Sequence, residues 1–124
     1  MTINFLFKYT QKVSSRLRIL LILTFWCTNL SYADKPTFEI IIENHLFIPS
    51  EVFVPANTKV KLIVHNNDPT PEEFESYELN REKVVMGKQK AVIFIGPLKP
   101  GKYPFFGEFF PTTAQGTIIA VDEQ

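Results

Sequence analysis

Cysteine and tryptophan are almost absent from this sequence of 124 residues: each occurs once, as Trp26 and Cys27. Residues 34–124 therefore cannot form an internal disulfide and must be stabilised by side-chain burial, for which about 90 residues suffice. Histidine is also scarce, with only His45 and His65. The sequence has no Ser–His–Asp or Cys–His set, no phosphate-binding glycine loop and no zinc motif. We predict that the protein is not an enzyme.

Acidic residues are absent from residues 1–33, which carry four basic residues ahead of an apolar run at 19–30. That run is about 12 residues long, whereas roughly 20 are needed to cross a bilayer. Ser31 and Ala33 supply the small residues of a cleavage site. The pattern predicts a signal peptide over 1–33, cleaved after Ala33, and a periplasmic mature form, 34–124, that does not span the membrane. The alternative is an uncleaved anchor.

Positive charge is not in excess in the predicted mature form. Nine of the 13 basic residues and all 13 acidic residues lie within 34–124, so its net charge is −4. Nucleic-acid binding requires a basic patch, and we therefore expect no nucleic-acid partner.

A sustained helical period is missing from residue 36 onward, where all nine prolines separate short runs of Val, Ile and Phe. Val60, Leu62 and Val64 share one face and Lys59, Lys61 and His65 share the other, which is typical of a half-buried strand. We expect Asn57 to adopt a positive φ in the turn before that strand. The pattern predicts seven or eight strands in an all-β, two-sheet sandwich. The expected extended segments are 38–43, 46–54, 59–66, 72–79, 80–85, 89–95, 102–106 and 116–121.

Several ordered segments between residues 37 and 121 resemble a cupredoxin. They read VPANTKVKLIVHNND, LKPGKY and GTIIAV. EEFESYELNREKVV and FFGEFFPTTAQG are more similar to the EfeO-type cupredoxin-like domain of bacterial periplasmic iron-uptake systems. The resemblance implies a Greek-key β-sandwich and a role in metal chemistry.

The resemblance also locates the ligands of a blue copper site, which are a Cys, two His and a Met. In this chain the four positions fall at Glu72 or Glu73, near Gly107, near Phe110 or Pro111, and near Gln115. The cysteines of the iron-uptake domains fall on Phe47 and on Phe106 or Gly107. Without a thiolate we expect no type 1 copper, and a copper electron carrier is the least favoured function.

Acidic residues cluster around the segment that replaces the first copper ligand. Carboxylate oxygens suit iron or another divalent or trivalent cation. The predicted metal ligands are Glu72, Glu73, Glu75 and Glu108, with Glu78 nearby. The alternative is a solvated acidic face balanced by Arg81, Lys83 and Lys88.

Four phenylalanines crowd the predicted loop region near the C-terminus: Phe105, Phe106, Phe109 and Phe110. Exposed rings would form a partner-binding surface, whereas buried rings would fill the space left by a metal site.

Two hypotheses for the function follow from these observations. The first is a periplasmic accessory in iron or other metal-ion uptake, with a membrane iron permease or another uptake component as partner. The second is a metal-free interaction module that binds its partner through the phenylalanine loop.

Overall fold

The computed structural model describes residues 33–123, which form strands and loops and no helix. No helix in this range is therefore long and apolar enough to cross a membrane. The predicted signal peptide lies outside the described residues, apart from Ala33. Nine strands are present: β1 (Thr37–Glu43), β2 (Leu46–Ile48), β3 (Glu51–Pro55), β4 (Val60–Asn66), β5 (Glu72–Ser76), β6 (Arg81–Val85), β7 (Lys90–Ile95), β8 (Gly101–Gly107) and β9 (Gln115–Val121).

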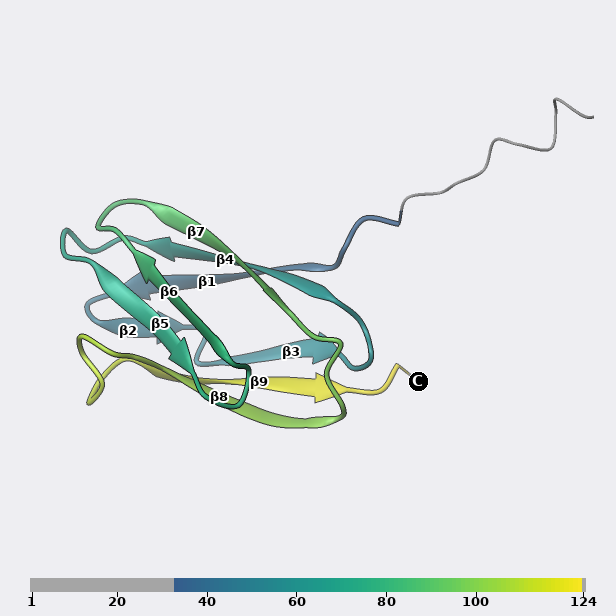
Figure 1. Cartoon of the computed structure of the whole chain (residues 1–124). Coiled ribbons are helices and arrows are strands. Elements are labelled where there is room, and N and C mark those ends of the chain that lie inside the picture. Colours follow the sequence, from purple (N-terminus) through teal and green to yellow (C-terminus); the bar gives the residue numbers. More distant parts are fainter. Residues whose placement is uncertain (1–32, 124) are drawn as a thin grey trace, which may run out of the picture. The chain divides into compact units, whose positions relative to one another are not determined.

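The strands form two packed sheets (Figure 1). The first sheet has the order β2-β1-β4-β7, and the second has the order β3-β9-β8-β5-β6. β1 pairs in parallel with β4, and β3 pairs in parallel with β9, while the other neighbours are antiparallel. The result is a two-sheet sandwich in which strands distant in sequence, such as β3 and β9, lie side by side.

Alternating side chains build the core between the sheets. Val60, Leu62 and Val64 of β4 are fully buried, as the polar–apolar alternation predicts. Three aromatic rings occupy the centre, where Phe105 lies 4.9 Å from Phe74 and 5.0 Å from Phe47 between ring centroids. The sandwich therefore has a dense aromatic centre without any disulfide in the described range.

The prediction of an all-β sandwich is confirmed, and so is the positive φ of Asn57. The structure differs at residues 46–54, which we expected as one extended segment. Pro49 interrupts that segment, β2 pairs with β1 in the first sheet, and β3 pairs with β9 in the second. The split follows from proline's missing N–H, which removes a ladder hydrogen bond. The number of strands is accordingly nine.

Four connections lie at one end of the sandwich: the β1–β2 turn, the β4–β5 loop, the β6–β7 turn and the β8–β9 loop (Figure 1). The Asp68 carboxylate accepts hydrogen bonds from the backbone N–H groups of Asn44 at 2.8 Å and His45 at 2.9 Å. The His45 ring stacks on Phe110 with 3.6 Å between centroids and 15° between planes. We call this part of the molecule the loop end.

Candidate functional site

Strand β5 directs successive glutamates to opposite faces of the second sheet. Glu72 points into the sandwich with Phe74 and is 1% exposed. Glu73 and Glu75 point outward and are partly exposed. Because side chains alternate along a strand, adjacent glutamates here occupy two separate environments.

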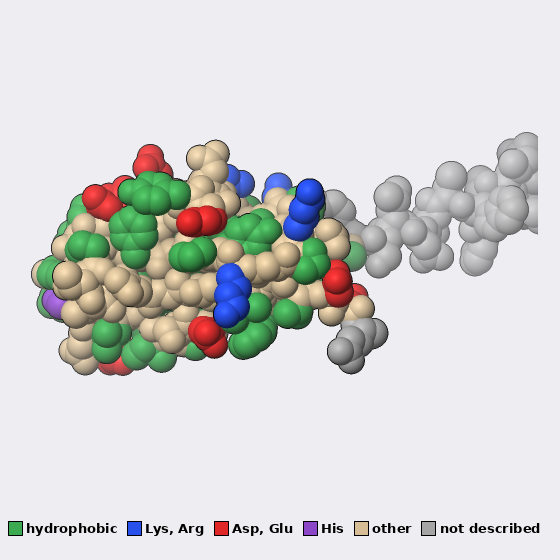
Figure 2. Space-filling view, turned by 90° about the horizontal axis from the view of Figure 1, so that it is seen from below, with side chains coloured by type: hydrophobic (Ala, Val, Ile, Leu, Met, Phe, Trp, Pro, Cys, Tyr) green, Lys and Arg blue, Asp and Glu red, His purple; other side chains and the backbone are tan. Residues whose placement is uncertain are grey.

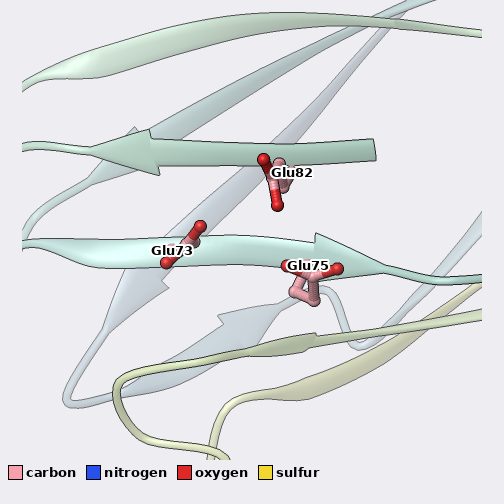
Figure 3. Close-up of side chains that lie close together, drawn as sticks. All are labelled: Glu73, Glu75 and Glu82. Carbon is pink, nitrogen blue, oxygen red and sulfur yellow. The ribbon is translucent and has the colours of Figure 1, made fainter. Parts of the chain in front are cut away.

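The outward glutamates meet a third on the neighbouring strand. Carboxyl oxygens of Glu73, Glu75 and Glu82 all lie within 4.8 Å of one another (Figure 3). The register explains this, because Glu75 pairs directly with Glu82 across β5 and β6. Within residues 33–123, no ion pair closer than 4.0 Å involves any of these three carboxylates. We call Glu73, Glu75 and Glu82 the acid triad.

Within the acid triad, Glu75 is repelled by the carboxylates around it. The pKa of Glu75 lies above its ordinary value, first because neighbouring protein displaces water from its carboxyl group. The negative charges of Glu82, Glu73 and Glu108 raise this pKa further. A cation among these oxygens would relieve the repulsion, and such oxygens are ligands for hard ions.

The predicted metal ligands are thus divided by the fold. Glu73 and Glu75 come together, and Glu108 is near enough to act on the Glu75 charge, with its N–H donating to the Glu73 carbonyl at 2.9 Å. Glu72 faces the other side of the sheet. Glu82 belongs to the cluster and was missed by the sequence reasoning. The signal available was the turn at residues 77–80, which fixes the β5–β6 register and places Glu82 opposite Glu75.

Glu72 connects β5 to the β8–β9 loop at the loop end. Its Oε1 accepts hydrogen bonds from the N–H groups of Glu73 at 2.8 Å and Phe109 at 3.0 Å. Its Oε2 is buried and has no hydrogen-bond partner within the described residues. A Cβ built on Gly107 would lie 2.5 Å from the Glu72 Cδ and 2.7 Å from the Ala114 Cβ. The carboxyl group therefore fills the space between β5 and the β8–β9 loop.

The blue copper ligand positions named above converge at this point, but their side chains do not fit copper. Glu72 lies against Gly107, and its carboxyl group accepts a hydrogen bond from the N–H of Phe109, the neighbour of Phe110 in the β8–β9 loop. The described side chains at these positions offer the Glu72 carboxyl group and the Gln115 amide, with no thiolate, imidazole or thioether, and the neighbouring His45 imidazole is stacked on Phe110. Type 1 copper requires a sulfur ligand and two histidines, so no electron-transfer step follows from this site.

The four loop phenylalanines are distributed over different environments. Phe105 is buried in the aromatic core. Phe106 lies half-buried on the outer face of the second sheet, where its ring is 5.6 Å from that of Tyr77. Phe110 stacks on His45 and packs against the core. Phe109 is 46% exposed and is the loop residue whose ring is most available to a partner.

Comparison with known proteins gives a consistent family match. A family model described as a cupredoxin-like domain matches residues 17–120. An uncharacterised protein of Rickettsia prowazekii (strain Madrid E) is 54% identical over 84 residues, which cover 68% of this chain and 67% of that protein.

Solved structures share the fold at low sequence identity. One is the metal-binding domain of the Cu(I)-exporting P-type ATPase CopA of Streptococcus pneumoniae D39, solved with Cu(I), with a TM-score of 0.62, 16% identity, and coverage of 69% of this chain and 85% of that chain. Another is auracyanin A, a blue copper protein of Chloroflexus aurantiacus, with a TM-score of 0.61, 13% identity, and coverage of 71% and 100%. Amicyanin from Paracoccus versutus has a TM-score of 0.54, 18% identity, and coverage of 72% and 83%. At these identities the likeness establishes the fold alone.

Proposed function

The chain belongs to the cupredoxin-like domain family, and from that premise we propose that it is a periplasmic accessory protein in the uptake of iron or another hard metal ion. The observation that carries the proposal is the acid triad, whose carboxyl oxygens lie within 4.8 Å of one another and make no ion pair closer than 4.0 Å in the described range. The family relationship to metal-binding proteins supports it. The protein acts by binding and transfer, not by catalysis.

The chemistry of the acid triad favours a hard cation held loosely. Oxygen ligands suit Fe(III), Mn(II) or Ca(II). Two members are partly exposed and one is exposed, so water completes the coordination shell and the ion can leave. Such a site is adapted to handing an ion to a membrane permease or another periplasmic uptake component.

Calorimetric titration of the purified protein with Fe(III)-citrate, Mn(II), Ca(II) and Cu(II) tests this function. We expect saturable binding of a hard ion, weakened at least about tenfold in the Glu75→Gln/Glu82→Gln double variant because two anionic ligands are lost. Glu43→Gln is the matched control, since Glu43 is an exposed strand residue of the first sheet. Absence of heat with every ion, or equal binding by the double variant, refutes the proposal.

A second candidate function is a metal-free interaction module that uses the β8–β9 loop. The specific observation is Phe109, whose ring is 46% exposed while its backbone N–H is held by Glu72. A large ring on an anchored backbone loses little entropy on binding.

The test replaces Phe109 with Ser and measures capture of partners from the periplasmic and membrane fractions. Phe110 is unsuitable for this test because its ring supports His45. We expect capture to be lost while the unfolding midpoint stays unchanged. Equal capture by the variant contradicts this second function.

A further inference from the structure

The outer face of the second sheet is uncovered within residues 33–123 and carries both apolar and acidic side chains. Four large apolar residues of this sheet and its adjoining turn and strand ends are strongly exposed: Phe53 (57%), Tyr77 (73%), Val84 (44%) and Val121 (43%). Figure 2 shows this face, with hydrophobic side chains spread across it and with both acidic side chains and several Lys or Arg side chains between them. A sheet face of this composition is suited to a partner that is itself amphipathic.

A groove crosses this face where β8 runs beside the start of β9. Its volume is about 620 Å³, and its lining includes Glu51, Pro104, Phe106, Pro111, Gln115 and Thr117. The strand register connects the groove to the acid triad. Phe106 pairs with Gln115 on one side and with Glu75 on the other, and Glu75 pairs with Glu82. The groove and the acid triad are therefore neighbouring parts of one surface.

The charge at the outward strand positions of this surface is mostly negative, although Arg81 lines a pocket with Glu75 and Glu82 at its edge. Outward strand positions hold four carboxylates, on Glu51, Glu73, Glu75 and Glu82. One lysine, Lys102, occupies an outward strand position on this sheet, at the opposite end of β8 from Phe106. Within residues 33–123 none of the four carboxylates makes an ion pair. This excess of carboxylates is complementary to a cationic partner.

The distance between the groove and the acid triad suits an extended segment that reaches both. Adjacent strands lie about 4.8 Å apart, so Phe106 is about that distance from Glu75 and about twice as far from Glu82. Same-side residues of an extended chain are about 6.7 Å apart. An apolar side chain in the groove therefore places a basic side chain two residues away over the acid triad.

We propose that this face binds an extended, cationic protein segment in which an apolar residue and a Lys or Arg alternate on one side. The apolar residue enters the groove beside Phe106, and the basic residue pairs with Glu75 and Glu82. This activity goes beyond metal binding, although it uses the same carboxylates. A bound hard ion and the cationic segment would compete for them.

Fluorescence polarisation tests the proposal with the purified protein in EDTA, which removes metal ions from the measurement. The probe is a labelled peptide repeating Leu-Ser-Lys-Ser, which presents Leu and Lys on one side when extended. Control peptides repeat Ser-Ser-Lys-Ser and Leu-Ser-Glu-Ser. We expect the probe to bind at least about fivefold more tightly than either control, and to weaken as salt rises from about 0.05 to 0.5 M. Equal binding of the probe and the Ser-Ser-Lys-Ser control overturns the proposal.

Variants separate the two parts of the surface. Glu75→Gln/Glu82→Gln should weaken the probe about five- to tenfold, and Gln115→Lys should weaken it by placing a positive charge in the groove. Glu43→Gln on the other sheet should have no effect. Equal affinities across these variants refute the proposal. If sedimentation shows a dimer that the double variant dissociates, the face belongs to a second copy of the chain, and the proposal fails. Metal titration without peptide shows separately whether the proposed uptake function stands.

Discussion

Glu72 offers the sharpest test of how the loop end is held together. Its carboxyl group is buried, and Oε1 accepts the Phe109 N–H at 3.0 Å across the gap between β5 and the β8–β9 loop. Glu72→Leu keeps a similar volume but removes the acceptor. Glu72→Gln keeps an acceptor at the same place. The pair of variants therefore separates the hydrogen bond from the packing.

The magnitude follows from the bonds lost. A hydrogen bond from a backbone N–H to this acceptor contributes about 1 to 3 kcal/mol when its loss leaves the donor unpaired. Since about 1.4 kcal/mol corresponds to tenfold, the Phe109 amide of the Glu72→Leu variant should exchange with solvent about 5- to 150-fold faster. The Gly107 N–H, which donates to the Ala114 carbonyl at 2.8 Å, should change little. The Glu72→Gln variant should lie between the wild-type protein and Glu72→Leu.

Amide hydrogen exchange followed by NMR provides the measurement, and a urea titration monitors global stability. Unchanged exchange at Phe109 in the Glu72→Leu variant would show that Glu72 does not hold the loop. Acceleration of Phe109 and Gly107 by the same factor would also contradict the reasoning, because it would report destabilisation of the whole domain and no local release.

Two further predictions concern stability. Gly107→Ala should lower the free energy of unfolding by about 1 to 3 kcal/mol, because the added methyl would lie 2.5 Å from the Glu72 Cδ; an unchanged urea midpoint would disprove this close packing. Burial raises the pKa of Asp68, but hydrogen bonds from the N–H groups of His45 and Asn44 outweigh it and hold the pKa below its ordinary value of 3.8. This stabilisation is therefore present above about pH 3.8 and is lost as the pH falls through the lower pKa of the folded state. Asp68→Asn should consequently make the urea midpoint depend less on pH in the acid range. A pH profile identical to that of the wild-type protein would refute the assignment.

Alternation along single strands was sufficient to predict much of the sandwich. Val60, Leu62 and Val64 are buried as the pattern predicts, because a period of two is a local property of an extended chain. The partners of each strand are not a local property. β2 and β3 are separated by only Pro49 and Ser50, yet they belong to different sheets, and their neighbours β1 and β9 come from opposite ends of the domain. Pro49 marks the break between them, but residues 46–54 do not identify the partner strands.

The candidate site was predictable to the same extent. Strand alternation places Glu73 and Glu75 on one face, and the structure agrees. The same alternation separates Glu72 from them, although their proximity in the sequence and their carboxylate chemistry had grouped all three as ligands. Glu82 required knowledge of the hairpin register, which brings residues seven apart in sequence into direct pairing. Clusters of this kind depend on cross-strand neighbours, so sequence spacing alone does not reveal them.

Glu72 and Glu73 are adjacent in sequence, and a one-residue change of strand face gives them different chemistry. At Glu72 the surrounding groups leave no room for an added atom beside Gly107 and satisfy one carboxyl oxygen with backbone amides. Ligand exchange at that position would require opening the loop end. At Glu73 the carboxyl group faces water beside Glu75 and Glu82, where an ion or a basic side chain can arrive and leave without rearranging the fold. We therefore infer that ligand binding in this chain belongs to the outer sheet face, while Glu72 serves to hold the β8–β9 loop against β5.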